Sequence, residues 1–151
     1  TKMVDAIYAL ALVHLTPAPM TPGAQMESTD YFTRHNLTVN QQRDGTGYAL
    51  SALTAGQKKD LVLSNRLRTM PGRVAIYGWH RTNGKPIQPL STVHGQGYAD
   101  YSHGIRLISA TAFVNGKPRA LADILQDPGI SAAVSPEGPI TLSNQLLASL
   151  Q

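Results

Sequence analysis

The chain has 151 residues and a net charge of +4, and 42% of its residues are hydrophobic against 15% that are charged. This length and composition predict one globular domain with its own core rather than a disordered chain. Lys and Arg are scattered without a basic stripe among aromatic residues, which argues against a nucleic-acid partner, and no apolar run has the length of a membrane span. Because the chain contains no cysteine, thiol catalysis, disulfides and thiolate metal ligands are excluded.

The N-terminal part is predicted to be mainly helical. Residues 2–15 place apolar side chains at spacings of three and four, which is the pattern of one buried helix face. A second helix is expected to begin at Ser28 or Thr29, whose hydroxyl can act as N-cap, and to end near residue 43. Residues 48–55 favour a short third helix.

Residues 57–118 are expected to form an antiparallel sheet that carries the candidate site. Strands are predicted over residues 60–65 and 73–80. The Asn-Gly pair within residues 82–85 predicts a β-hairpin with a type I′ turn. The two prolines of residues 86–90 lack a backbone donor, so the returning strand is expected at an edge of the sheet.

A strand is also predicted over residues 105–108, and the run that begins there extends to residue 114, where a second Asn-Gly turn follows. Residues 119–125 can form a short helix, and residues 140–151 either a strand turning into a helix or a tail. Helices followed by an antiparallel sheet with a Gly- and His-rich loop indicate an α+β fold. We expect a single domain over residues 1–151, with a helical part (1–56), a sheet with the candidate site (57–118) and a C-terminal helix and tail (119–151).

The stretch of residues 73–108 contains three of the five histidines and many glycines. His94, Asp100 and His103 have the spacing H-x5-D-x2-H, and imidazole nitrogens with one carboxylate and a water are the ligands of a catalytic zinc ion. The glycines would let the backbone fold tightly enough to aim these groups at one point. The sequence therefore predicts a site for zinc or another divalent metal, although histidines in glycine-rich loops often have no ligand role.

A metal-free site is the second interpretation of the same stretch. His80 or His103 could act as general acid or base, oriented by Asp100, and Arg106 could hold an anionic group of a substrate. In a regular strand Ser102 and His103 would face opposite sides, so a direct pair between them needs a bulge. The candidate nucleophiles are Ser91, Thr92 and Ser102.

Aromatic residues support a third interpretation, a binding site for a small molecule, a glycan or a peptide. Trp79, Tyr98 and Tyr101 could form a platform on which a sugar or an apolar ligand stacks. The structural alternative is that these side chains belong to the core, since alternation along residues 73–80 places apolar groups on both faces of a strand. In that case Arg106 is a solvated strand residue.

Residues 102–107 (SHGIRL) resemble the SHGC-[IV]-R-L signature of the L,D-transpeptidases that cross-link peptidoglycan, and His94 with the following glycine resembles the other His-Gly of that family. The nucleophilic cysteine of the family would fall between Gly104 and Ile105, and it is missing here. The resemblance points toward cell-wall material and excludes transpeptidase chemistry.

Residues 92–100 (TVHGQGYAD) resemble the S-x-H-x-x-G-x-A-x-D zinc motif of D-Ala-D-Ala peptidases, with His94 at the position of the motif's histidine. Thr92 replaces the serine and Asp100 comes one residue early. The Glu–Trp–His cluster of that family follows its zinc motif, whereas Trp-His at residues 79–80 precedes the motif here. The resemblance implies a zinc site that includes His94.

The block YGWH…HG…DYSHGIRL also resembles uncharacterised secreted bacterial proteins. The chain begins at Thr1 and enters a helical pattern at once, which favours a processed piece of an exported precursor. We expect an extracellular or periplasmic protein whose partners include the remainder of that precursor or a second copy of the chain. The leading hypothesis is a hydrolase with a His/Asp site, metal-assisted and acting on cell-wall material. The alternative is a non-catalytic ligand-binding or structural module.

Overall fold

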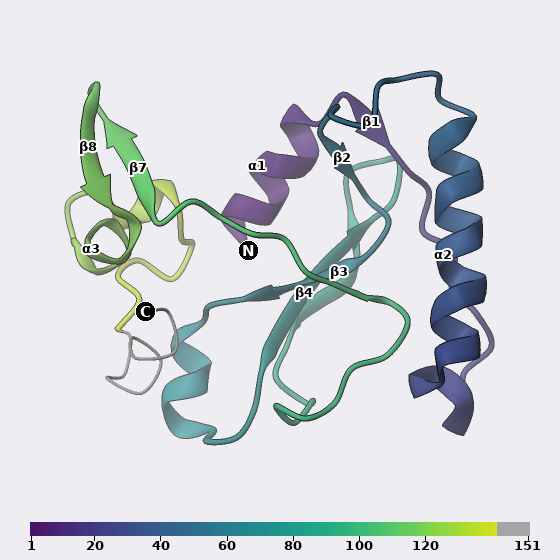
Figure 1. Cartoon of the computed structure of the whole chain (residues 1–151). Coiled ribbons are helices and arrows are strands. Elements are labelled where there is room, and N and C mark those ends of the chain that lie inside the picture. Colours follow the sequence, from purple (N-terminus) through teal and green to yellow (C-terminus); the bar gives the residue numbers. More distant parts are fainter. Residues whose placement is uncertain (142–151) are drawn as a thin grey trace.

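The computed structural model describes residues 1–141 and has an α+β fold (Figure 1). Its main elements are α1 (Lys2–Leu10), α2 (Thr29–Asp44), β3 (Lys59–Val62), β4 (Ala75–His80), β5 (Pro86–Ser91) and β6 (His103–Gly104). The strands form one sheet in the order β5-β4-β3-β6. The β3–β4 and β4–β5 pairs are antiparallel and the β3–β6 pair is parallel. The sheet lies between α1 and α2 (Figure 1), so the expected order of helices followed by a mostly antiparallel sheet is confirmed.

The N-terminal helix is shorter than predicted. It ends at Leu10, and the rest of the range 2–15 includes β1 (Val13–His14), which pairs in parallel with β2 (Thr54–Ala55). The helix predicted over residues 48–55 is not formed, because its last residues belong to β2 and the others lie in turns and loop. Both predictions fail for one reason: the local apolar pattern carries no information on pairing between segments far apart in the chain.

The second helix begins where its N-cap predicts. The Ser28 hydroxyl accepts a hydrogen bond from the N–H of Tyr31 at 3.3 Å, which satisfies one of the free donors at the helix start. Tyr31 and His35 are the buried residues of α2. They face Trp79 and Tyr101. Tyr31, Trp79 and Tyr101 together form a core cluster.

A β-bulge in β4 directs neighbouring side chains to different helices. The register with β5 shifts between Ile76 and Gly78, and Gly78 and Trp79 have positive φ angles of 112° and 59°. The regular alternation predicted along this strand is therefore broken. Trp79 packs on the α2 side, whereas the His80 ring stacks on Tyr8 of α1 with centroids 4.7 Å apart.

The hairpin between β4 and β5 is confirmed, but its turn is not type I′. The N–H of Arg81 donates to the carbonyl of Lys85 at 2.9 Å, which closes a loop of three residues. A type I′ turn needs positive φ at both central residues, and of Asn83 and Gly84 only Gly84 has it (77°). β5 is an edge strand, as its prolines predict.

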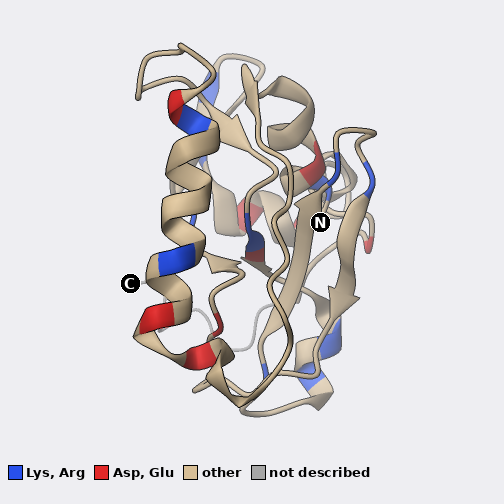
Figure 2. Ribbon diagram, turned by 90° about the vertical axis from the view of Figure 1, so that its right-hand side faces the viewer, with Lys and Arg blue, Asp and Glu red and all other residues tan. Residues whose placement is uncertain are grey.

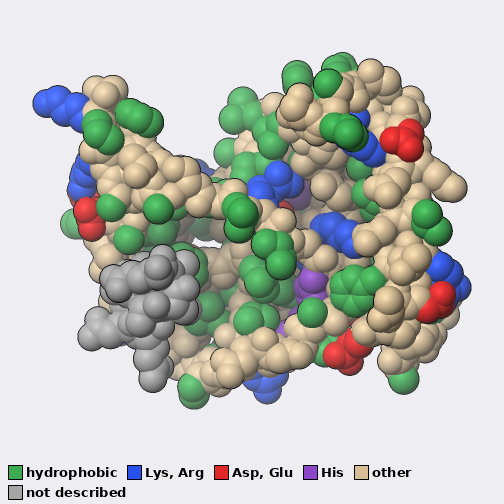
Figure 3. Space-filling model, viewed as in Figure 1, with side chains coloured by type: hydrophobic (Ala, Val, Ile, Leu, Met, Phe, Trp, Pro, Cys, Tyr) green, Lys and Arg blue, Asp and Glu red, His purple; other side chains and the backbone are tan. Residues whose placement is uncertain are grey.

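The segment that follows β6 is extended and exposed, and it is not the strand predicted over residues 105–108. Its residues 105–109 have no strand partner among residues 1–141. Ile105 and Leu107 are 88% and 92% exposed. Figure 3 shows hydrophobic side chains gathered with Lys and Arg on the face that this segment crosses. The apolar residues of this segment therefore lie on the surface and are not buried in the sheet.

The C-terminal part begins with a small hairpin of β7 (Thr111–Val114) and β8 (Lys117–Ala120). Asn115 and Gly116 have φ angles of 51° and 77°, so the second Asn-Gly pair makes the type I′ turn. The short helix predicted next is present as α3 (Leu121–Gln126).

A second core cluster forms where Leu125 of α3 packs with Ile140. The strand, helix or tail considered for residues 140–151 lies almost entirely outside the described residues.

No helix within residues 1–141 has the length and apolar character needed to cross a membrane, and Lys and Arg are spread over the fold (Figure 2). The short 3-10 helices are η1 (Ala24–Glu27), η2 (Asn65–Thr69) and η3 (Ser131–Ala133).

Candidate metal centre

The loop between β5 and β6 carries the candidate site. It runs from one edge of the sheet to the other, because β5 and β6 are the two edge strands. The N–H of Val74, the residue before β4, donates to the carbonyl of His94 at 3.1 Å. At the far end of the loop, the N–H of Lys59 donates to the carbonyl of Ser102 at 2.8 Å. Both ends of the loop are therefore held by the backbone of the sheet.

Three side chains predicted as metal ligands converge in this loop. His94, Asp100 and His103 each offer one ligand atom, and these three atoms lie within 4.8 Å of one another. Asp100 is buried and both histidines are partly buried. The residues with the spacing H-x5-D-x2-H thus form a possible metal-binding triad.

Hydrogen bonds hold the Asp100 carboxylate as an anion. Oδ1 accepts from the N–H of Ser102 at 2.8 Å and from the Ser102 hydroxyl, and Oδ2 accepts from the Tyr98 hydroxyl at 3.1 Å. Burial by itself would raise the pKa of Asp100, but the two bonds from Ser102, together with the positive charge of Lys59, outweigh it and keep the pKa below its ordinary value. The site therefore contains a buried negative charge at neutral pH.

Both imidazoles of the triad are uncharged at pH 7. Burial lowers the pKa of His103 and of His94, and Lys59 acts in the same direction, while the Asp100 carboxylate opposes them. The His94 ring stacks on Tyr98 with centroids 4.4 Å apart, and it lies edge-on to the His103 ring at 5.4 Å. The neutral form is the one that binds a metal.

The donor types fit zinc, but the donor atoms would have to move to bind it. Ligand atoms at about 2.0 Å from a tetrahedral zinc lie roughly 3.3 Å from one another, whereas those of the triad are spread up to 4.8 Å. The N–H of Asp100 also donates to Nδ1 of His103 at 2.9 Å, and Nε2 is buried without a partner among residues 1–141. An ion at Nδ1 would replace the Asp100 N–H, and an ion at Nε2 would displace the ring hydrogen, which the neutral imidazole carries on Nε2 when Nδ1 accepts a hydrogen bond.

Lys59 is a charged neighbour of the triad that no sequence motif indicates. It is paired with His103 in the register of β3 and β6, and its Nζ lies 5.4 Å from the centroid of the Trp79 ring. Burial lowers the pKa of Lys59, and the Asp100 carboxylate opposes this effect. Lys59 directly precedes the strand predicted over residues 60–65, but the parallel pairing with β6 cannot be inferred from this position.

Two other predicted residues lie beside the triad in supporting positions. The Ser102 side chain is 1% exposed, and its hydroxyl donates to Asp100, so it orients the carboxylate rather than standing as a free nucleophile. Tyr98 contacts His94 by stacking and Asp100 by its hydroxyl.

Trp79 and Tyr101 lie in the core rather than on a binding surface. They are 5% and 3% exposed, and the Tyr101 hydroxyl accepts from the N–H of Met20 at 2.7 Å. The structural alternative considered for them, packing in the core, describes their positions.

His80 and Arg106 lie away from the triad, in contact with other groups. Nε2 of His80 is 2.9 Å from Oδ1 of Asp5 in α1, and Arg106 donates to the carbonyl of Thr54 at 3.1 Å. Both residues line a different cavity, between α1 and the sheet.

Comparison of the chain with protein-family models, with curated proteins and with solved structures found no match.

Proposed function

We propose that His94, Asp100 and His103 bind a divalent cation, zinc by its donor set, and that the chain uses it for a metal-assisted hydrolysis. The observation that carries this proposal is the convergence of three ligand atoms to within 4.8 Å of one another. Three protein ligands that leave a fourth position to water are typical of catalytic rather than structural zinc sites. Zinc in such a site lowers the pKa of its bound water and polarises the carbonyl that is attacked.

The residues around the triad suit this chemistry. His94 and His103 need not lose a proton to become ligands at pH 7, because their pKa values lie below the ordinary one. Ser102 orients the Asp100 carboxylate through two hydrogen bonds, as the outer partners of metal ligands commonly do. Lys59 adds a positive charge that would stabilise an oxyanion developing on the substrate.

Peptides of peptidoglycan are the substrate class that we infer. The sequences around His94 and over residues 102–107 resemble motifs of two families of cell-wall enzymes. Because the cysteine of one of these families is missing, the thiol chemistry of that family is excluded, and hydrolysis by a metal-bound water is the reaction that we propose. An exported protein would meet this substrate in the periplasm or outside the cell.

A non-catalytic module of an exported protein is the second candidate, and one contact favours it. The N–H of Asp100 occupies Nδ1 of His103, so the two residues already form a closed hydrogen-bonded turn without a metal. In this role the triad would stabilise the loop between β5 and β6, and any partner would bind elsewhere.

Digestion of purified peptidoglycan peptides tests the proposed hydrolysis. The parent chain is assayed with added zinc and with a chelator, beside His103→Ala and the control His14→Ala, which changes an exposed histidine of β1. We expect zinc-dependent cleavage by the parent and by His14→Ala, and loss of cleavage with the chelator or in His103→Ala. Absence of cleavage by the zinc-loaded parent would overturn hydrolysis of this substrate class and favour the non-catalytic role.

A further inference from the structure

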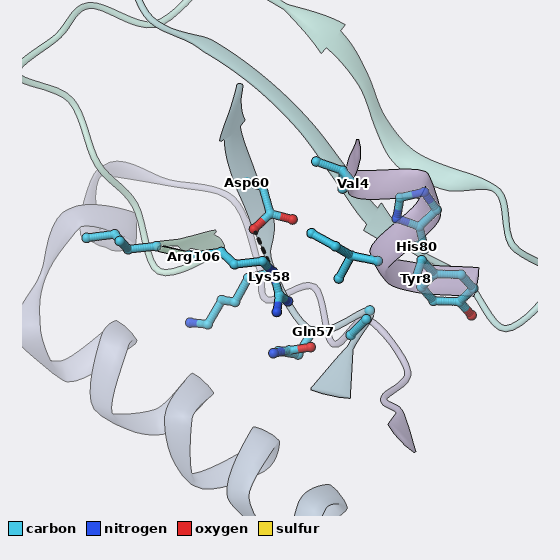
Figure 4. A pocket seen from close by; sticks show the side chains of 12 residues that line it. Val4, Tyr8, Gln57, Lys58, Asp60, His80 and Arg106 are labelled. Carbon is cyan, nitrogen blue, oxygen red and sulfur yellow. Dashed lines mark ion pairs between the residues drawn. The ribbon is translucent and has the colours of Figure 1, made fainter. Parts of the chain in front are cut away.

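A cavity of about 90 Å³ lies between α1 and the sheet, and it contains no residue of the metal triad. Figure 4 shows Asp60 and Arg106 pointing toward each other on one side of the cavity, with Val4 and Tyr8 of α1 on the other side. Ile105 also lines the cavity and is 88% exposed, so the cavity reaches the surface at the segment that follows β6.

The ion pair between Asp60 and Arg106 in the cavity is long, and both side chains have polar atoms that are not used in it. Nε of Arg106 lies 3.7 Å from Oδ1 of Asp60, which is longer than a direct hydrogen bond. Arg106 uses Nη2 to donate to the carbonyl of Thr54. The rest of the guanidinium, and the second carboxylate oxygen of Asp60, remain available to a ligand that carries charges of both signs.

Gln57 adds an acceptor that has no donor. Its Oε1 is buried and lacks a hydrogen-bond partner among residues 1–141, and the residue lines the same cavity. A buried amide oxygen without a donor destabilises the fold. A ligand with an N–H group would supply the missing donor.

His80 forms a fixed wall of the cavity. Its Nε2 is held by Oδ1 of Asp5 at 2.9 Å, and its ring is stacked on Tyr8 at 4.7 Å. Gly78 allows this packing, since a side chain there would meet Val4 at 3.3 Å. The polar groups of the cavity therefore stand on the sheet side, opposite an apolar and aromatic surface from α1.

We propose that this cavity binds a small α-amino acid, with the carboxylate of the ligand on Arg106 and its ammonium group between Asp60 and Gln57. The volume allows about six water-sized groups at roughly 15 Å³ each, which matches glycine or alanine and excludes large side chains. Lys58 also lines the cavity, but its ammonium group donates to the Asn36 side chain and to the Tyr101 carbonyl. A zwitterion leaves the charge of the Arg106–Asp60 pair balanced, whereas a simple anion or cation would not.

An NMR titration of the labelled chain with glycine tests the proposal, with acetate and methylammonium as single-charge probes. We expect glycine to shift the backbone amides of Gln57, Asp60 and Ile105 with a millimolar Kd, and both probes to bind at least about tenfold more weakly. Asp60→Asn and Arg106→Gln should each raise the Kd for glycine at least about tenfold. Arg119→Gln is the matched control, because Arg119 forms a comparable ion pair with Asp127 away from the cavity.

Three results would overturn the proposal. The first is the absence of shifts at these amides with saturating glycine. The second is binding of glycine by Asp60→Asn as tightly as by the parent. This result can be obtained even if Arg106→Gln does not fold. The third is binding of acetate as tight as that of glycine, which would show a site for anions rather than for amino acids.

Discussion

The backbone N–H of Asp100 donates to Nδ1 of His103 at 2.9 Å, and the Asp100 carboxylate lies 3.9 Å from the same nitrogen. A nitrogen that accepts from an N–H must carry a lone pair. Since His103 is neutral at pH 7, its ring hydrogen is on Nε2. A metal can therefore bind His103 only by displacing the Asp100 N–H from Nδ1 or the hydrogen from Nε2.

The tautomer of His103 is the first prediction. In metal-free protein at pH 7, long-range nitrogen–hydrogen NMR correlations should identify the Nε2–H form. Addition of zinc should shift the backbone amide of Asp100 with either ligating nitrogen, because Nδ1 then no longer accepts from the Asp100 N–H. Conversion of His103 to the Nδ1–H form is expected only if the ion takes Nε2. Zinc that leaves both signals unchanged would show that His103 is not a ligand.

The pH dependence of stability provides the second prediction, through His35. Burial, with a further contribution from Lys58, lowers the pKa of His35 to about 4, whereas an imidazole in the unfolded chain has a pKa of about 6.5. Between these values the unfolded state binds more protons, so the free energy of unfolding falls as the pH falls, by at most about 1.4 kcal/mol per pH unit from this group. Below pH 4 the folded protein is protonated as well and this contribution no longer changes.

Urea denaturation at several pH values from 7 to 4.5 measures this effect. Because His94 and His103 contribute to the slope as well, the comparison is made with His35→Leu, which retains both of them. The free energy of unfolding of the variant should depend less steeply on pH than that of the parent. An identical slope in the two proteins would show that His35 titrates normally in the fold.

The third prediction concerns two glycines with positive φ. Gly56 (φ 100°) and Gly84 (φ 77°) both disfavour a side chain, but an added Cβ would lie 2.3 Å from the carbonyl oxygen of Leu15 at Gly56 and would meet nothing within 4 Å at Gly84. Gly84→Ala should lower the free energy of unfolding by about 1 to 2 kcal/mol. Gly56→Ala should lower it by roughly a further 2 kcal/mol or more, because backbone atoms have to shift. Thermal unfolding of the two variants that gave equal losses would contradict this placement of Gly56 against Leu15.

Local sequence predicted those parts of the molecule that depend on neighbouring residues. The cap at Ser28 predicted α2, and the prolines of β5 predicted an edge strand. His94, Asp100 and His103 lie on one loop, so their spacing was sufficient to suggest that they converge.

Features that depend on long-range pairing were not predictable in this way. β1 replaces the last part of the expected first helix because Val13 and His14 pair with Thr54 and Ala55. The bulge at Gly78 separates His80 from the triad by turning it toward α1. Lys59 reaches the site only because β3 pairs with β6, which no local pattern indicates.

The metal content of the natively purified chain tests the central claim most directly. Elemental analysis is made on the parent, on His94→Ala and His103→Ala, and on His14→Ala as the control with an exposed histidine changed. We predict about one zinc or other divalent ion per chain in the parent and in His14→Ala, and its loss in both triad variants. A parent that is metal-free and does not take up added zinc, or triad variants that keep the metal of the parent, would contradict a metal site at His94, Asp100 and His103.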